Sequence, residues 1–236
     1  MLIAWNGNVM KYAKSTRNGK TLKGNNYPVA IIATTTTNKS LGKERVNRGY
    51  EMITDMGCRW KHFKTVWKHK QVVYRECKAC GIRWQGIVHD LSKFSRAEFV
   101  PAAKYYQGSR SPIEAEKEDV GYSDSWLHHK AHNKHHWEYW CDYNNDTGEV
   151  FPHPIPMKYI VEMLCDWIGA GKVYSKEKWT QAEPLNYYNK VRQGRHFEPN
   201  TEQMIIHFLK VIRDDGLDKF HKECKEALKV AKQVSQ

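Results

Sequence analysis

The chain has 236 residues and a formal net charge of +12 at pH 7, from 38 Lys and Arg against 26 Asp and Glu. Its 40% hydrophobic and 12% aromatic content is enough for a folded core and excludes a wholly disordered chain. The apolar runs are far shorter than the roughly 20 residues of a membrane-spanning helix, and the N-terminus lacks the basic leader of a signal peptide. We therefore expect one or two globular domains and no membrane partner.

The cysteines and the charge indicate the surroundings in which the chain works. The six cysteines lack the spacing of a disulfide framework, which favours a reducing compartment, so we expect the cytoplasm. The positive charge favours a polyanionic partner, which is nucleic acid, nucleotide phosphate or an acidic surface. The sequence leaves the oligomeric state open.

Residues 1–48 differ in composition from the rest of the chain. They contain nine basic residues and a single acid, Glu44. Their one sustained apolar run, residues 29–33, predicts a strand, and Asn-Gly pairs and a threonine run punctuate the remainder. We interpret this segment as a basic N-terminal extension, β-containing or loosely ordered.

From residue 49 onward, helical spacing of apolar residues dominates. Residues 59–80 predict one long helix that ends at Gly81. A capping box formed by Ser95 and Glu98 predicts a second helix starting just after Ser95. Ser123 and Asp124 predict a third, running through a cluster of histidines to residues 144–148.

The C-terminal third continues the helical pattern. A fourth helix is expected after Pro156, with an apolar stripe that ends at residues 169–171. Asn200 with Gln203 predicts the start of a fifth, and Gly216 separates it from a last helix that ends near Val234. Residues 49–236 are therefore predicted to form a mainly α domain.

Asp166 is a carboxylate inside the apolar stripe of the fourth predicted helix. Burying an unpaired carboxylate costs several kcal/mol, so this side chain needs an arginine, a proton or a metal ion. The alternatives are a simple ion pair or exposure of that face. His89 and Asp90 likewise enter the fold beside core residues, and their imidazole and carboxylate together suit Mn, Fe, Co, Ni or Zn. His69, alone on the long helix, is by itself typical of a core or boundary histidine.

Five histidines fall between residues 128 and 136. On a continuous helix, His129 and His136 share one face, and His128 and His135 form a parallel file. A solvated polar face is the plainer interpretation. Histidine has no advantage in helix propensity over Lys or Glu, however, so a metal or phosphate site is favoured.

Cys77 and Cys80 have the spacing of half a zinc site. Because no second pair follows at a usable distance, we interpret them as core residues rather than as zinc ligands.

The order of these residues along the chain resembles the HD superfamily of metal-dependent phosphohydrolases, and most closely an HD-like group common in bacteria and their phages. The likeness is carried by His-Asp-Leu-Ser-Lys-Phe-Ser at 89–95 and His-His-Lys-Ala-His-Asn-Lys-His-His-Trp-Glu-Tyr-Trp at 128–140, between His69 and Asp166. It covers roughly residues 60–175. It does not extend to the N-terminal extension or the last two helices.

The resemblance implies an HD-like helical bundle that holds one or two divalent ions: Mn, Fe, Co, Ni, Zn or Mg. The residues that it assigns to the first ion are His69, His89, Asp90 and Asp166. His129 and His136 fall where two-metal members place further ligands. The crowding leaves that second pair open between 129 with 136 and 128 with 135.

The resemblance also implies a catalytic role for Asp90 and for Lys93, whose ammonium would meet a phosphate oxygen. An ordinary exposed lysine is the alternative for Lys93. Glu138 and Asn133 would orient the imidazoles through hydrogen bonds, with a plain surface position as the alternative for Glu138.

The function predicted from the sequence is hydrolysis of a nucleotide or another phosphoester, with a phosphorylated small molecule attracted by the excess positive charge. One alternative is an HD-like di-iron oxygenase. Another is a nucleic-acid-binding protein whose metal is structural or absent, in which residues 11–48 and exposed Trp and Tyr side chains hold phosphates and bases.

Overall fold

The computed structural model describes residues 4–6, 9–11 and 41–234, with side chains from residue 56 to residue 233. The chain divides into two compact units, residues 1–43 and residues 44–236. In the first unit, β1 (Ala4–Asn6) and β2 (Val9–Lys11) pair antiparallel, with Trp5 opposite Met10. The strand predicted at residues 29–33 lies outside the described residues.

The division of the chain falls inside a helix. α1 (Leu41–Ala79) is continuous across residue 43, and it also crosses the boundary predicted between residues 48 and 49. The assignment of residues 1–48 as a separate extension stays a prediction.

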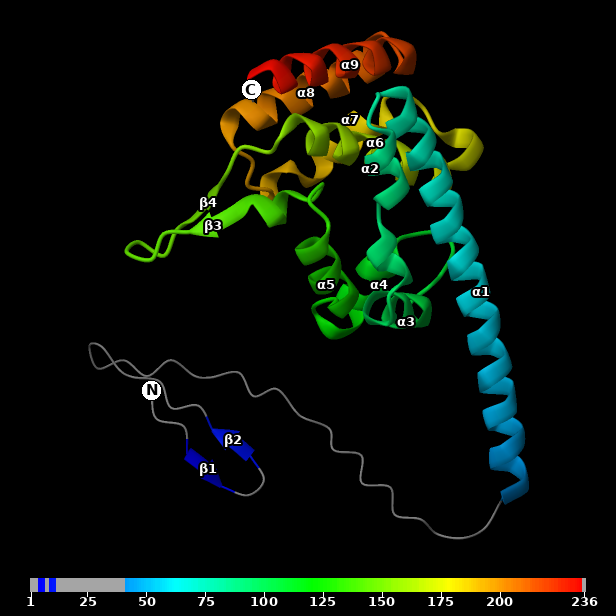
Figure 1. Cartoon of the computed structure of the whole chain (residues 1–236). Helices are drawn as coiled ribbons and strands as arrows, with labels where there is room; N and C mark the ends of the chain where they lie inside the picture. The colour runs from blue at the N-terminus through cyan, green and yellow to red at the C-terminus, as the bar shows by residue number, and fades with distance from the viewer. Residues whose placement is uncertain (1–3, 7–8, 12–40, 235–236) are drawn as a thin grey trace. The chain divides into compact units, whose positions relative to one another are not determined.

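The second unit is mainly α-helical, which confirms the predicted fold class (Figure 1). Its α-helices after α1 are α2 (Arg83–Val88), α3 (Arg96–Lys104), α4 (Pro112–Val120), α5 (Asp124–His132), α6 (Met157–Tyr174), α7 (Glu183–Val191), α8 (Pro199–Asp214) and α9 (Leu217–Val234). Four short 3-10 helices are η1 (Leu91–Phe94), η2 (Trp137–Trp140), η3 (Lys176–Lys178) and η4 (Arg192–Gly194). An antiparallel hairpin of β3 (Cys141–Tyr143) and β4 (Val150–Pro152) follows η2.

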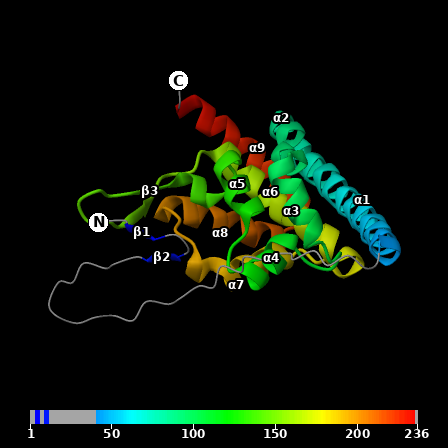
Figure 2. The same cartoon turned by 90° about the horizontal axis from the view of Figure 1, so that it is seen from below.

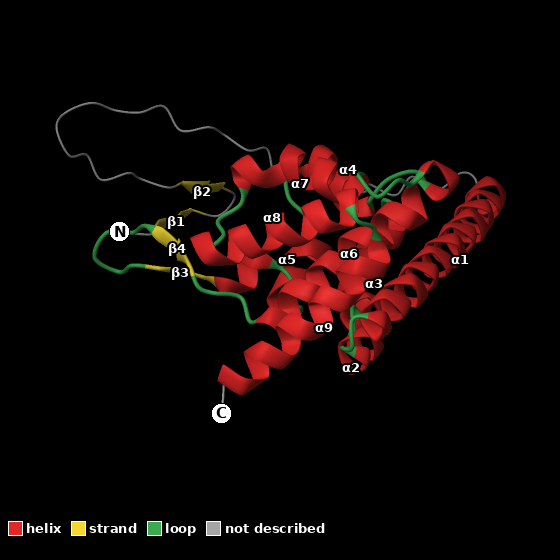
Figure 3. Ribbon diagram, turned by 90° about the horizontal axis from the view of Figure 1, so that it is seen from above, coloured by secondary structure: helices red, strands yellow, loops and turns green. Residues whose placement is uncertain are grey.

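The helices of this unit form two groups. α6 packs against α7, α8 and α9, whereas α3 packs against α4 and α5. Figure 1 shows α1 running along the side of both groups. Figures 2 and 3 show the bundle from below and from above, and in Figure 3 α6 lies between α8 and α1. Within the described residues, no helix combines the length and the apolarity needed to cross a membrane.

The central helix α6 is longer than its sequence predicted. Its apolar stripe is buried, but the helix continues through the glycines at 169–171 to Tyr174. A β-carbon on Gly169 would lie 2.5 Å from Cγ2 of Val73 on α1, and one on Gly171 would lie 2.8 Å from Nε1 of Trp179. These glycines therefore make room for neighbouring side chains and do not end the helix.

The capping residues of α3 and α8 show how the predicted starts of these two helices compare with the structure. The Oγ of Ser95 accepts a hydrogen bond from the Glu98 backbone N–H at 3.4 Å, so α3 starts where the capping box predicted. The start predicted at Asn200 is wrong, because the carboxylate of Glu198 caps α8 by accepting from the backbone N–H groups of Asn200 and Thr201 at 3.1 Å and 2.8 Å.

The third predicted helix is much shorter than expected. α5 ends at His132, and the prediction that it continues to residues 144–148 is wrong. Asn133 leaves the helix with φ −119° and ψ 109°, and its side-chain Nδ2 donates to the His129 carbonyl at 2.8 Å. Such local bonds from an asparagine compete with the helical pattern. The later histidines therefore reach the interior from a turn.

The cysteine pair is part of the core, in agreement with its interpretation from the sequence. Cys77 and Cys80 are fully buried together with Cys165 of α6 and Cys224 of α9. Sγ of Cys80 lies 3.8 Å from Sγ of Cys165.

A buried carboxylate ties three helices together and predicts a pH dependence. Glu76 of α1 accepts hydrogen bonds from Lys172 of α6 at 2.6 Å and, through its other oxygen, from His221 of α9 at 2.8 Å. Burial opposes both charges, but the bonds to His221 and Lys172 hold the pKa of Glu76 below 4.5, and Glu76 raises the pKa of His221 above 6.5.

The stabilisation from Glu76 is present above pH 4.5 and is lost as the pH falls through its lowered pKa. The stabilisation from His221 is present below pH 6.5 and is lost as the pH rises through the raised pKa of this histidine. We expect the melting temperature of His221→Gln to lie furthest below wild type between about pH 4.5 and 6.5, and the gap to narrow above that range. Thermal scans of metal-free protein across pH 4 to 9 measure this gap, and a pH-independent gap would contradict the ion pair.

Candidate metal centre

Four of the predicted ligands meet in the interior of the second unit. They are His69 of α1, His89 and Asp90 from the turn between α2 and η1, and Asp166 of α6. Nε2 of His69 lies 3.0 Å from Oδ1 of Asp166 and 3.6 Å from Oδ2 of Asp90. Nε2 of His89 lies 3.5 Å and 3.3 Å from the same two oxygens. Ligands that bind one ion at about 2.0–2.2 Å are themselves about 3.0–3.6 Å apart. The four atoms therefore have the spacing of ligands around a common ion.

A second group of ligand atoms adjoins the first and consists of Asp90, His129, His135 and His136. Oδ1 of Asp90 lies 3.3 Å from Nε2 of His129 and 3.4 Å from Nε2 of His135. The ring of His136 lies 4.7 Å and 4.2 Å, between centroids, from the rings of these two histidines. Because Oδ1 of Asp90 faces this group and Oδ2 faces the other, one carboxylate serves both groups.

The histidine cluster brings one of the two open pairs together, His129 with His136, and adds His135 to it. The structure brings together His129, His135 and His136, and it places His128 outside. Nδ1 of His128 lies 2.7 Å from Oε1 of Glu98, and its ring stacks on His132 at 4.0 Å. Both predicted pairs assumed one continuous helix, whereas α5 ends before His135 and His136.

The buried polar atoms of the centre fit a metal ion. Among the described residues, the buried side-chain atoms without a hydrogen-bond partner include Nε2 of His69, His89, His135 and His136 and Oδ1 of Asp90. Oδ2 of Asp90 forms an ion pair with Lys93. Leaving buried polar atoms without a partner costs about 1–3 kcal/mol each, more for charged groups. Because these atoms point at one another across two ligand groups, divalent ions would satisfy them together.

The turn that carries Asp90 has an unusual backbone. Asp90 adopts φ 54° and ψ 25°, a left-handed conformation that is rare for residues other than glycine and that is often retained at functional sites. Nζ of Lys70 donates to the carbonyl oxygens of Ile87 and His89, at 2.7 Å each. This lysine fastens the turn to α1, one residue from His69, and so positions His89 and Asp90.

Carboxylates behind the imidazoles fix their orientation. Oε1 of Glu162, one turn before Asp166 on α6, lies 3.1 Å from Nδ1 of His89 and 3.3 Å from Nδ1 of His135. Oε2 of Glu98 lies 2.7 Å from Nδ1 of His129. A hydrogen bond at Nδ1 sets the tautomer in which Nε2 is free to bind a metal.

Of the two residues predicted to orient the imidazoles, Asn133 lies beside a histidine, whereas no such contact is found for Glu138 among the described residues. Nδ2 of Asn133 lies 3.1 Å from Nδ1 of His129 and donates to Oγ of Ser92 at 2.7 Å. Glu138 instead holds a buried oxygen, Oε2, without a hydrogen-bond partner.

The centre concentrates negative charge in the interior. Burial would raise the pKa of Asp90 and Asp166, but the facing imidazoles, with Lys93 in the case of Asp90, hold each pKa well below its usual value. Burial also opposes ionisation of Glu162, but hydrogen bonds from His135 and His89 lower its pKa to about 2. The buried Asp90 and Glu162 and the partly exposed Asp166 therefore favour their ionised forms, which the facing imidazoles and Lys93 stabilise.

A cavity of about 670 Å³ opens onto the centre. His69, His129, His136 and Asp166 line it together with Lys93, whose Nζ lies 2.5 Å from Oδ2 of Asp90. Further lining residues are the cations Lys117 and Arg195 and the aromatic residues Trp126, Trp137, Trp167, Tyr174 and Tyr187. The lining also includes acids, among them Glu114 and Glu183. The cavity therefore offers cations, carboxylates and flat apolar surfaces next to the candidate ligands.

Residues 58–211 match DUF5662, a family of unknown function. The chain belongs to this family. The matched part of the chain, residues 58–211, includes both ligand groups and the carboxylates of Glu98 and Glu162 behind them. No curated protein and no solved structure matches the chain.

The sequence did not indicate Glu162 or Glu98 as parts of the centre, and it left His135 open only as the partner of His128. The signal for Glu162 was its position four residues before Asp166, because two acids at this spacing share one face of an apolar helix. Glu98 had been assigned only to a helix cap. Its side chain instead contacts His128 and His129, while its backbone N–H completes the cap.

We expect Glu162→Gln to weaken the binding of both ions by about 10- to 100-fold, because Glu162 orients one histidine from each group. Glu98→Gln is the matched control, since Glu98 contacts a ligand of the second group alone. Competition with a fluorescent chelator measures the two affinities. Equal effects of Glu98→Gln on both ions, or no effect of Glu162→Gln, would contradict these roles.

Proposed function

We propose that this protein is a metal-dependent phosphohydrolase of the HD type that acts on a nucleotide or another phosphoester. The observation that carries the proposal is the shared position of Asp90, whose two oxygens face two separate groups of imidazole and carboxylate ligands. Two ions held a few ångströms apart are typical of enzymes that displace groups at phosphorus.

The donor set supports particular metals and a particular chemistry. Imidazole nitrogens with carboxylate oxygens suit Mn, Fe, Co, Ni or Zn, and Mg less well. When bound, such ions lower the pKa of water towards 7 and neutralise charge that develops on phosphate oxygens. His69, His89, Asp90 and Asp166 would hold one ion, and His129, His135 and His136 with Asp90 the other.

The chain's own residues bind and orient the substrate in this proposal. Lys93 lines the cavity and pairs with Asp90, so its ammonium is placed to contact a phosphate oxygen beside the centre. The Arg195 guanidinium lies over the rings of Trp167 and Tyr187 at 5.0 Å and 5.2 Å, and its Nη2 donates to the Tyr187 hydroxyl at 2.8 Å. This fixed cation can hold a second phosphate oxygen, and the partly exposed aromatic residues that line the cavity, such as Trp126 and Trp137, suit a nucleobase.

We expect Lys93→Gln to keep the metal content of wild type and to raise KM by about tenfold, because it removes a charge-assisted hydrogen bond worth roughly 1.5–3 kcal/mol to a phosphate. Steady-state kinetics on the best substrate measure this change. Loss of bound metal in Lys93→Gln would instead assign the lysine to the stability of Asp90.

The experiment that tests the function combines metal analysis with a substrate screen. The purified chain is analysed for metals, stripped with a chelator and reloaded with each divalent ion in turn. It is then assayed on bis(p-nitrophenyl) phosphate and on nucleoside mono-, di- and triphosphates. We expect about two ions per chain and phosphoester hydrolysis that disappears on stripping and returns on reloading.

Two other outcomes would replace this proposal. Iron with oxygen uptake, and no release of phosphate or nitrophenol, would favour the di-iron oxygenase. Nucleic-acid binding that survives stripping, with no turnover of any phosphoester, would favour the binding protein. We retain the cytoplasm as the proposed compartment, on the spacing of the cysteines.

A further inference from the structure

The outer face of α1 exposes large aromatic side chains. Trp60 is 58% exposed and Trp67 is 48% exposed. Both lie on the side of the helix opposite His62 and His69, which are buried. A tryptophan on an outer helix face adds nothing to the core, so its position calls for another explanation. We call the surface formed by Trp60, Lys61, Phe63, Lys64, Trp67 and Lys68 the α1 ridge.

The rings of the α1 ridge form a row that is held in place. Trp60 and Phe63 stack with centroids 5.5 Å apart and planes 6° from parallel, and Phe63 and Trp67 follow at 6.3 Å and 12°. Phe94 of η1 packs edge-on against Phe63 at 5.9 Å and against Trp67 at 6.5 Å. Nζ of Lys64 lies over the Trp60 ring, 5.2 Å from its centroid, so a base that stacks on this face displaces the ammonium. A row fixed before binding loses little conformational entropy when a ligand stacks on it.

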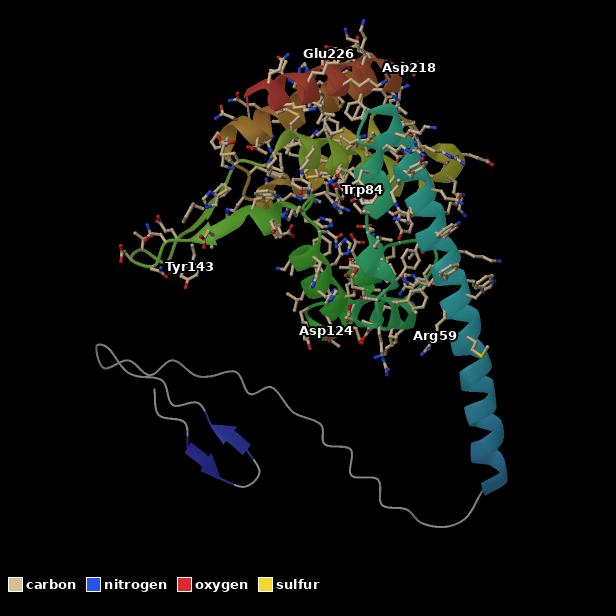
Figure 4. The ribbon with its side chains drawn as sticks, viewed as in Figure 1. Arg59, Trp84, Asp124, Tyr143, Asp218 and Glu226 are labelled. Atoms are coloured by element: carbon tan, nitrogen blue, oxygen red, sulfur yellow. The ribbon has the colours of Figure 1, made fainter. Side chains whose placement is uncertain are left out.

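The ridge and the segment that follows it in the chain carry mainly positive charge. Residues 56–100, all with described side chains, contain ten Lys and Arg and three acids. Those acids, Glu76, Asp90 and Glu98, are all buried. On α2, Trp84 is 68% exposed and follows Arg83. Figure 4 labels Trp84 on α2 and Arg59 on α1, one residue before Trp60. This stretch of the chain therefore presents cations and aromatic rings to solvent without an exposed carboxylate.

We propose that the α1 ridge binds single-stranded nucleic acid, with bases stacked on Trp60 and Trp67 and phosphates paired with Lys61, Lys64 and Lys68. Exposed rings between cations are the pattern of proteins that bind single strands, because every base has a flat face and every linkage carries a charge. A duplex hides the faces of its bases. An apolar protein partner would leave the lysines without counter-charges. The proposal is independent of the metal centre, since none of the ridge residues is a candidate ligand.

The test is fluorescence anisotropy of the full chain with labelled (dT)20 and U20, in a chelator and across 50–300 mM KCl. We expect Trp60→Ala/Trp67→Ala to weaken binding at least tenfold, because each stacked base contributes strongly to affinity. Lys64→Glu/Lys68→Glu should also weaken binding. It should also reduce the slope of log K against log [salt] by about 1.4, because each lost phosphate contact of a single strand accounts for about 0.7. The two oligonucleotides show whether DNA or RNA is preferred.

Lys210→Glu/Lys222→Glu is the matched control, because it changes the net charge equally at exposed positions of α8 and α9. We expect it to reduce affinity less than threefold. The proposal is overturned if the control loses as much affinity as Lys64→Glu/Lys68→Glu, or if duplex binds as tightly as single strand. Unchanged oligonucleotide affinity in Trp60→Ala/Trp67→Ala would also overturn it. If that variant at the same time turned a dimer into a monomer in sedimentation, the occupant would be a second copy of the chain. Circular dichroism checks that each variant is folded.

Discussion

Asp90→Asn is expected to remove both metal ions and to reduce phosphoester turnover by at least about 10³-fold. The reason is that its two oxygens face different ligand groups, so a single substitution weakens both. Asparagine tolerates the left-handed backbone at this position, φ 54°, better than most residues, so the change tests the charge and not the turn. Metal analysis after gel filtration and kinetics with the best substrate measure the two effects.

Asp166→Asn is the control for this prediction. Asp166 contacts His69 and His89 of the first group, and it is not a member of the second. We therefore expect this variant to lose about one ion per chain and Asp90→Asn to lose about two, while the helical content of both stays at the wild-type level. Full metal occupancy in both variants would refute the centre, and equal partial losses would refute the sharing of Asp90.

The parts of the fold that the sequence predicts are those set by local patterns. The apolar stripe of α6 and the capping box at Ser95 each depend on residues within one or two turns, and the structure contains both. The local patterns gave wrong predictions where a residue is fixed by contact with a residue far away in the chain. Gly169 resembles a helix end in the sequence, but its missing side chain accommodates Val73, which lies 96 positions earlier in the chain.

The residues of the candidate site also fall into those that the sequence identified and those that depend on distant contacts. His69, His89, Asp90 and Asp166 were found because their order along the chain resembles a known arrangement, and the structure brings them together. His135 was left open only as the partner of His128, because a continuous helix would put both on one file. The end of α5 at His132 changes the direction of the chain and separates them. That end depends on hydrogen bonds of Asn133 to His129 and Ser92, and Ser92 belongs to another helix. Contacts of this kind have no signal in local spacing.

Gly169→Ala is expected to lower the free energy of unfolding by about 1–3 kcal/mol, the usual cost of adding a methyl group to a tightly packed core. The new β-carbon would lie 2.5 Å from Cγ2 of Val73, a fully buried side chain, and 3.6 Å from Cε1 of His69. Relief of the overlap requires α1 and α6 to separate. We therefore also expect weaker binding of any metal ion by the group that contains His69 on α1 and Asp166 on α6. Urea unfolding of the metal-free protein measures the first effect.

Gly57→Ala on α1 is the matched control, because a β-carbon there meets no atom within 4 Å. Alanine favours a helix over glycine by up to about 1 kcal/mol, so this variant should be as stable as wild type or more stable. Val73→Ala removes the atom that the new β-carbon of Gly169→Ala would meet. Gly169→Ala should therefore destabilise the Val73→Ala variant less than it destabilises the wild-type protein. An unchanged cost would mean that the destabilisation does not arise at the α1–α6 contact, and that the spacing of these two helices does not set the distance between His69 and Asp166.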